Sequence, residues 1–308
     1  MNTRAFLILG AVVFRVTSAL AAPCCGGSAA LPAMITGDDR AQLQSTYSQG
    51  IVVGDAPSVG IPVFRAAGDD ERSNTFRLEG AYRVFDRVQF GGGIPLVRRA
   101  RSVNGTGSEA FGFGDVTVNA AYEVLPEWDY SSWRPKGFLF LQTTLPTGSS
   151  TYDSRSPLQL DARGRGFFSL GLGSAFLKTL GNWDFLLTVE LHRSLGRTAT
   201  DLDDTEMYLR PGFGGSIGLG AGYSPWGESL RLGVALAPQW EQGIRVEGAI
   251  RSQGSDQLVW NLSFQTSYLI SDEWSVAGVY SDQTLLGPVQ NVSLNRALAL
   301  SVMKRWNL

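Results

Sequence analysis

Histidine, cysteine and charged residues are all scarce in this chain of 308 residues. His192 is the only histidine, which argues against a zinc site made from the usual nitrogen and sulfur ligands. Charged residues make up 18% of the chain and the formal net charge is −2, so the sequence offers no basic surface for a phosphate backbone. We therefore predict no nucleic-acid partner, no metal and no cofactor.

Long apolar stretches are also missing. After the first 22 residues, no run of 18 or more apolar residues occurs, which excludes membrane-crossing helices from the remainder. Only helices and closed barrels satisfy every backbone polar group in lipid. If the remainder spans a membrane, it must do so as a β-barrel.

The first 22 residues predict a secretory signal peptide. Arg4 gives the positive start, 5–13 the apolar run and 19–21 a small-residue cleavage site, so we expect cleavage after Ala21 or Ala22. The mature protein would then begin with a flexible periplasmic arm or plug over 23–40.

The two cysteines, Cys24 and Cys25, lie next to each other in that arm. Pro23 precedes them where a lipoprotein signal needs a small residue, which disfavours lipidation. An oxidised or unpaired cysteine pair fits the export compartment.

Glycine and aromatic residues are abundant, and apolar residues alternate with small or polar ones. Over 258–270 the even positions are nearly all apolar or aromatic, and 230–240 and 298–308 repeat the pattern. These runs last about 10–13 residues, the length that a tilted strand needs to cross the hydrocarbon layer. The fold class predicted is all-β, a transmembrane antiparallel up-and-down β-barrel over 41–308.

About twelve strands are expected, with short turns at one end and longer loops at the other. Barrels of this kind keep short turns in the periplasm and long loops outside, which places both termini on the periplasmic side. The predicted strands lie near 41–53, 74–85, 87–98, 110–123, 136–146, 165–178, 182–194, 209–223, 229–241, 256–271, 273–283 and 292–308. The predicted long loops are 54–73, 99–109, 147–164, 195–208, 242–255 and 284–291.

Six tryptophans lie near the predicted periplasmic turns or the C-terminus, which is typical of an aromatic girdle at a membrane–water interface. They are Trp128, Trp133, Trp183, Trp226, Trp274 and Trp306. The last strand, 301–308, has apolar or aromatic residues at alternate positions and resembles the C-terminal signal recognised by the barrel-assembly machinery. It ends on Leu308 where phenylalanine is usual.

The alternation also predicts which polar side chains face the lumen. The proposed selectivity residues are Arg77, Glu79, Arg83, Asp115, Glu190, His192, Arg231 and Arg305. Rings of charge and hydrogen-bonding groups would select solutes in an open pore. Alternatively, the same residues would form ion pairs that fill a closed barrel, with 23–40 as an inserted segment.

One arrangement suggests catalysis. His192 and Ser194 lie on one strand face and Glu206 follows, which resembles outer-membrane phospholipases and lipid A deacylases. Such an enzyme needs its nucleophile turned towards the bilayer, whereas the alternation turns Ser194 to the lumen. We therefore predict that the protein is not an enzyme.

Two segments resemble a known family. Phe111-Gly112-Phe113-Gly114-Asp115 with the strand that follows, and Phe138 to Gly148 ending in Leu-Pro-Thr-Gly, are similar to the meta-pathway phenol-degradation family of outer-membrane barrels. The resemblance implies a transporter-like barrel that takes up aromatic or other hydrophobic compounds, with no catalytic residues to carry across.

The leading functional hypothesis is a passive channel in the bacterial outer membrane for small, hydrophobic or aromatic molecules. A closed barrel with a structural or surface-adhesion role and a lipid-active hydrolase are the alternatives. Outer-membrane lipids, the assembly machinery and a small-molecule solute are the expected partners.

Overall fold

The computed structural model describes residues 31–103, 105–127, 133–156, 158–200, 206–227, 229–248 and 251–307. The predicted signal peptide, Cys24, Cys25, Trp128 and Leu308 lie outside these residues. None of the described residues belongs to a helix long and apolar enough to cross a membrane.

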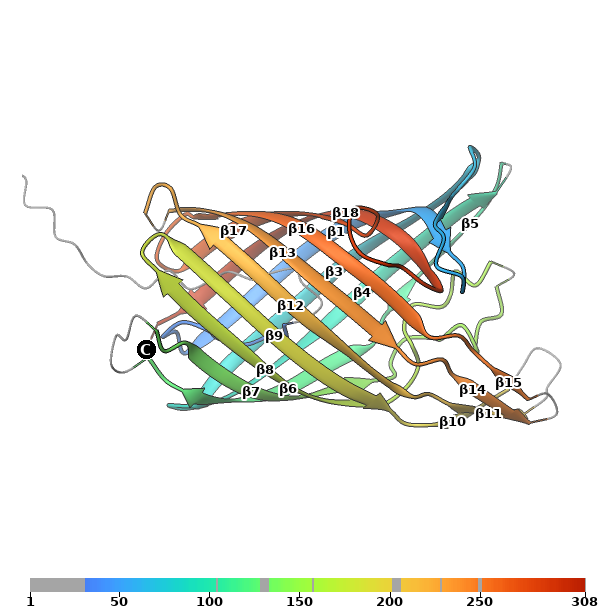
Figure 1. Ribbon diagram of the computed structural model, residues 1–308, viewed down its shortest axis with the longest axis horizontal. Helices are drawn as coiled ribbons and strands as arrows, with labels where there is room; N and C mark the ends of the chain where they lie inside the picture. Colours follow the sequence, from blue (N-terminus) through green and yellow to red (C-terminus); the bar gives the residue numbers. More distant parts are fainter. Residues whose placement is uncertain are drawn as a thin grey trace, which may run out of the picture.

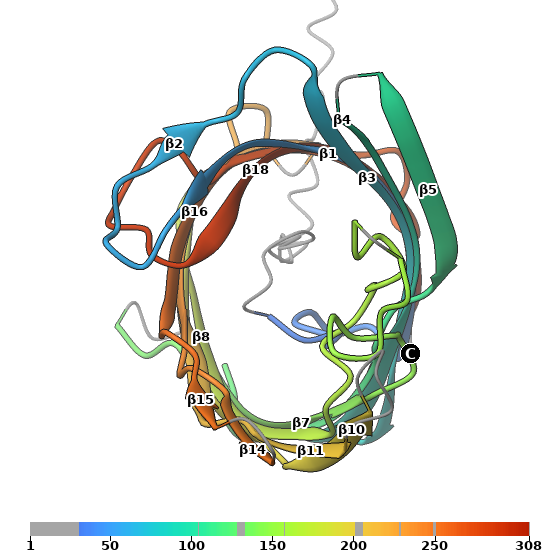
Figure 2. The same ribbon diagram turned by 90° about the vertical axis from the view of Figure 1, so that its right-hand side faces the viewer.

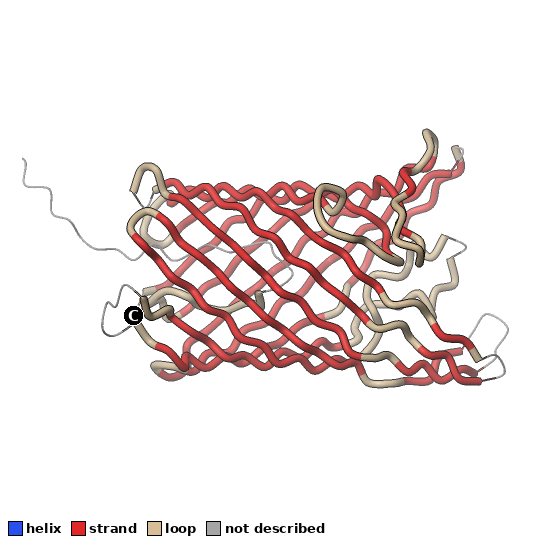
Figure 3. The backbone as a smooth tube through the Cα atoms, in the orientation of Figure 1, coloured by secondary structure: helices blue, strands red, loops and turns tan. Residues whose placement is uncertain are grey.

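A closed antiparallel barrel forms the body of the protein (Figures 1 and 3). Each strand pairs with its neighbours along the chain, and β1 pairs with β18 from Ala41↔Trp306 to Ala56↔Val292, which closes the sheet. Closure removes the unpaired sheet edge that lipid does not tolerate. The barrel strands are β1 (Ala41–Ala56), β3 (Asp69–Phe85), β4 (Val88–Val103), β6 (Val116–Leu125), β7 (Lys136–Leu145), β8 (Ser169–Leu180), β9 (Trp183–Ser194), β12 (Phe213–Tyr223), β13 (Leu230–Glu241), β16 (Gln257–Leu269), β17 (Trp274–Asp282) and β18 (Val292–Trp306).

The period of two predicted from the sequence is confirmed by exposure. On β9, Trp183, Phe185 and Leu187 are 38–50% exposed on the outside, whereas Asp184 and Leu186 between them are buried inside. An apolar outer face and a mixed interior are what a barrel in lipid requires. The predicted all-β barrel is therefore confirmed.

Two of the predicted long loops contain short strands that form a sheet of their own. The segments 195–208 and 242–255 contribute β10 (Arg197–Thr200), β11 (Glu206–Arg210), β14 (Arg245–Gly248) and β15 (Ser252–Gln253), which form a separate four-stranded sheet at the long-loop end. These strands have only 2–5 residues, too short for alternation to reveal them.

The predicted strand 110–123 is interrupted. It divides into β5 (Thr106–Phe113), which pairs only with β4, and β6, with Gly114 and Asp115 between them. The predicted loop 99–109 is mostly strand as well, because β4 and β5 continue as a hairpin beyond the barrel. Within the predicted loop 54–73, the two-residue strand β2 (Val63–Phe64) pairs with the end of β1.

Two segments enter the lumen from opposite ends (Figure 2). The loop between β7 and β8, described over 146–156 and 158–168, folds inward from the long-loop end, and we call it the inner loop. The N-terminal segment 31–40 lies inside the barrel at the short-turn end, where its Met34 and Ile35 are buried. The space between the two segments positions the candidate site.

Candidate functional site

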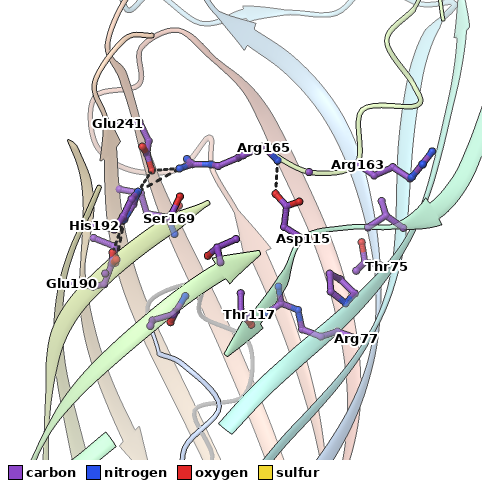
Figure 4. Close-up of a pocket in the computed structure, with 18 of the residues that line it drawn as sticks. Thr75, Arg77, Asp115, Thr117, Arg163, Arg165, Ser169, Glu190, His192 and Glu241 are labelled. Atoms are coloured by element: carbon purple, nitrogen blue, oxygen red, sulfur yellow. Dashed lines mark hydrogen bonds and ion pairs between the residues drawn. The ribbon is translucent and has the colours of Figure 1, made fainter. Parts of the chain in front are cut away.

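A polar cavity of about 660 Å³ lies in the lumen towards the long-loop end (Figure 4). Its wall comes from the lumen-facing positions of β3, β4, β6, β7, β8, β9, β12 and β13, and from Ala162 to Arg165 of the inner loop. Charged and hydrogen-bonding side chains supply much of the lining. Those used below are Arg77, Arg99, Asp115, Arg165, Glu190, His192 and Glu241.

One wall of the cavity carries a chain of charged groups around His192. Its Nδ1 lies 2.9 Å from Oε1 of Glu190, and its Nε2 lies 2.7 Å from Oε1 of Glu241. Arg165 of the inner loop reaches across to Glu241 at 2.5 Å. This row of charged groups therefore links β9, β13 and the inner loop, and it presents charges of both signs to a solute.

Two of these residues, Glu241 and Arg165, escaped the sequence prediction. Glu241 shares the parity of Arg231 on β13, so the alternation could have placed it in the lumen. Arg165 could not be found that way, because it belongs to a loop whose inward course depends on contacts distant in sequence.

Asp115 holds the inner loop in place. Its Oδ1 accepts the backbone N–H of Gly148 at 2.9 Å, and its Oδ2 accepts those of Arg165 at 2.6 Å and Gly166 at 3.3 Å. Gly164 passes so close that a side chain there would overlap the carboxylate. The Gly-x-Gly-Asp segment thus fixes a loop rather than lining an open pore.

Replacing Asp115 with alanine should free the inner loop. Hydrogen bonds to a charged acceptor contribute about 1.5–3 kcal/mol each, so removing three should raise the fraction of molecules with a released inner loop at least roughly tenfold. Single-channel recording measures the current through the lumen, and protease cleavage within 151–165 measures how accessible the inner loop has become. Asparagine keeps one acceptor oxygen and should fall between. If the alanine variant shows wild-type currents and its inner loop stays protected from protease, Asp115 does not hold the loop in place.

The inner loop is also anchored near the long-loop end. Burial alone would raise the pKa of Asp153, but hydrogen bonds from Arg197 and Ser150 lower it below its ordinary value of 3.8. A carboxyl with a lowered pKa stabilises the folded loop above its ordinary pKa and loses that effect as the pH falls through the lowered value. The anchor therefore persists at neutral pH.

The opposite wall of the cavity is rich in arginine. Arg77 pairs with Glu79 on β3 at 3.1 Å, and Arg99 pairs with Glu71 at 2.5 Å while donating to the carbonyl of Ala162 at 2.8 Å. Figure 4 shows Arg77 across the cavity from Glu190 and His192. A solute in the cavity would lie between an arginine-rich wall and one with two glutamates.

The N-terminal segment is held by side chains of the barrel wall. Gln89 accepts the N–H of Ile35 and donates to its carbonyl at 2.9 Å. Asn119 donates to the carbonyl of Ala33 at 3.0 Å, and Gln42 to that of Met34 at 2.9 Å. These contacts are individual side-chain hydrogen bonds. Backbone pairing with the wall begins at Arg40, which donates to Trp306 and accepts from Arg83, so the preceding residues are not held by strand pairing.

Beneath this segment the inner wall is apolar, which is unusual for a barrel lumen. Phe138 and Phe140 are almost completely buried at 1% exposure each, and Met34 packs against them. The patch also contains Ala121, Ala175, Leu177 and Leu186.

The remaining predicted lumen residues lie at the short-turn end, apart from the cavity. Arg83 donates to the carbonyl of Gly37 and so binds the N-terminal segment. Arg231 forms a two-armed ion pair with Asp184, at 2.6 and 2.7 Å. Arg305 interacts through its charge with Asp39. The structure therefore divides the predicted set between the cavity, the plug contacts and one buried pair.

The arrangement expected of a hydrolase is not assembled. Both ring nitrogens of His192 face glutamates, and Ser194 is buried with its Oγ 2.6 Å from Oγ of Ser169. Glu206 begins β11 in the separate four-stranded sheet at the long-loop end. Within the described part of the chain, no three His, Cys, Asp or Glu side chains are grouped as metal ligands.

Five of the six predicted girdle tryptophans are described, and all belong to the short-turn end. Trp183 packs on Tyr223 with ring centroids 4.8 Å apart, and Lys304 lies 5.2 Å from the rings of both Trp274 and Trp306. Trp133 and Trp226 are 89% and 74% exposed.

No protein-family model matches the chain, and a search of curated proteins also gives no match. The resemblance to the phenol-degradation family is therefore not confirmed. Among solved structures, an outer-membrane channel from Pseudomonas putida F1 is similar with a TM-score of 0.68, at 16% identity over 87% of this chain and 96% of that one.

Two further structures have lower scores. The NanC porin gives a TM-score of 0.45 at 9% identity, over 86% of this chain and 100% of the porin. A variant of the TodX monoaromatic hydrocarbon channel gives 0.43 at 10% identity, over 88% and 91%. At 16% identity, the likeness to the Pseudomonas channel establishes the fold alone, and that fold is an outer-membrane β-barrel.

Proposed function

We propose that the protein is an outer-membrane channel for passive passage of small molecules. The observation that carries this proposal is the polar cavity, surrounded by the barrel wall, with an inserted segment at each end that the wall binds through hydrogen bonds. A barrel whose lumen served only stability would be expected to fill this space with packed side chains.

The solutes are small, hydrophobic or aromatic compounds that also carry a polar group. A polar group would bind between the arginines and glutamates of the cavity. An apolar ring would then find Phe138, Phe140 and their neighbours once the N-terminal segment moves aside. The cavity volume admits a single compound of modest size.

Single-channel recording of the refolded full chain tests the channel proposal. We expect brief openings from a mostly closed state. After subtraction of the rate in protein-free vesicles, uptake of 4-nitrophenol into protein-containing vesicles should exceed that of glucose. An absence of current, even when either closing segment is released by substitution, would overturn the proposal.

A closed barrel with a structural or surface-adhesion role is the second candidate. The extracellular sheet of β10, β11, β14 and β15 favours it, because Leu209, Ala199 and Phe167 give that sheet a small buried core of its own. Such a role would leave the vesicle uptake of both solutes at the background rate.

A further inference from the structure

The outer face of the barrel carries three arginines on neighbouring strands near the long-loop end. Arg296 of β18 and Arg72 of β3 both lie directly opposite Ile51 of β1, so the three residues form one row on the same face. Arg98 of β4 lies in the next row, opposite Asn74. Because neighbouring strands are about 4.8 Å apart, the outer two residues of the row are separated by roughly 10 Å at the backbone.

The arginines stand at the boundary of the apolar outer face. Two positions nearer the short-turn end, Arg98 is followed by Leu96 and Arg296 by Leu298, which is 57% exposed. On β3, Asn74 lies two positions and Phe76 four positions nearer the short-turn end than Arg72, and Phe76 is 42% exposed. This is the level at which lipid headgroups meet acyl chains.

Arg72 has no ion-pair or hydrogen-bond partner among the described residues, although it is exposed on this face. Arg98 pairs with Glu109, but both side chains are more than half exposed, and such pairs exchange partners at little cost. Arg296 contacts the buried Asp282 at 2.8 Å and keeps 44% of its side chain exposed. Arg72 is therefore available to an external anion, and Arg98 and Arg296 keep partly exposed guanidinium groups.

Amide side chains lie between the arginines. Gln49 and Asn74 are direct neighbours in the row of Arg98, and Tyr47 donates to Asn74 at 3.2 Å. Amides and a phenol suit the hydroxyl and amide groups of a sugar, whereas guanidinium groups suit phosphate. Separated arginines with amides between them fit a headgroup that carries separated phosphates on a disaccharide.

We propose that Arg72, Arg98 and Arg296 form a binding site for the phosphorylated glucosamine disaccharide of an outer-leaflet glycolipid. The acyl chains would then lie along Phe76, Leu96 and Leu298. The inference rests on the membrane placement in the proposed function, and it does not depend on conduction through the lumen.

Native mass spectrometry of the full chain in detergent, titrated with bisphosphorylated hexa-acylated lipid A, tests this site. Each guanidinium near a lipid headgroup changes affinity roughly fivefold, so the triple variant R72A/R98A/R296A should lose on the order of a hundredfold. The matched control K304A removes a lipid-facing positive charge from the opposite rim of β18 and should stay within about twofold of wild type. An unchanged triple variant, or an equal loss in K304A, would overturn the site.

Two further measurements identify the class of lipid that binds and exclude a folding defect in the triple variant. Dephosphorylated lipid A and phosphatidylglycerol should both bind more weakly than lipid A, and equal binding of phosphatidylglycerol would overturn the glycolipid assignment. If the triple variant lacks the heat-modifiable gel mobility of a folded barrel, R72A alone should still show a roughly fivefold loss. Single-channel currents of the variants should match wild type, so a failed channel proposal and a failed lipid site give different results.

Discussion

Replacing Gly91 with alanine should open the lumen at its short-turn end. Gly91 faces inward on β4, and a Cβ there would overlap the backbone carbonyl of Ala33 in the N-terminal segment. That carbonyl is also the acceptor for Asn119. Displacing it should therefore break this bond and strain the neighbouring bonds between Gln89 and Ile35.

The expected effect is large because few bonds hold the segment. A net hydrogen bond contributes about 1 kcal/mol, so losing two should raise the open probability roughly tenfold or more. Single-channel recording of the full-length variant measures this change directly. The barrel wall should be unaffected, since the strand pairing of β4 does not involve the segment.

A matched glycine provides the control. Gly220 also faces the lumen, on β12, but a Cβ there would meet Leu186 and Ala235 at ordinary contact distances of 3.4–3.9 Å. The Gly220→Ala variant should conduct as wild type does. A Gly91→Ala variant that folds and conducts like wild type would show that the N-terminal segment does not close the lumen.

The barrel could be predicted from sequence because lipid imposes a local rule. Outward positions that contact acyl chains are mostly apolar, so residues such as Phe185, Leu187 and Val234 repeat at period two without regard to partners elsewhere. The end of each strand was less predictable. Strands β10 and β11 lie beyond the hydrocarbon layer, where the rule no longer applies.

The site was only partly predictable because its geometry depends on contacts between distant segments. Alternation placed Glu190 and His192 on the lumen face, but it says nothing of the inner loop that brings Arg165 to Glu241. That loop is fixed by Asp115, about 50 residues away from Arg165. The position and small residues of the N-terminal segment suggest that it inserts into the barrel. No pattern in it identifies Gln89 as its partner.

The ion pair between Arg231 and Asp184 is another contact that alternation does not predict. The two residues belong to β13 and β9, which are separated by β12, and they meet because Gly222 of β12 leaves the space between them empty. Asp184 has the parity of a lumen residue, so alternation could have found it. Its partner depends on the register of three strands, which alternation does not determine.

Breaking this pair should destabilise the barrel strongly. Both side chains are only 9% exposed, so the Arg231→Leu substitution leaves the Asp184 carboxylate buried without its counter-charge. Removing one partner of a buried ion pair costs about 3–5 kcal/mol of unfolding free energy. Guanidinium chloride titration of the variant in lipid vesicles, followed by tryptophan fluorescence, measures the change.

The double variant R231L/D184L separates a charge effect from a packing effect. Replacing both partners with apolar side chains removes the unpaired charge, and such replacements are often neutral or stabilising. We therefore expect the double variant to regain most of the stability that R231L loses. If the double variant is as unstable as R231L, the loss comes from packing around Gly222, and the ion pair does not explain why Arg231 faces the lumen.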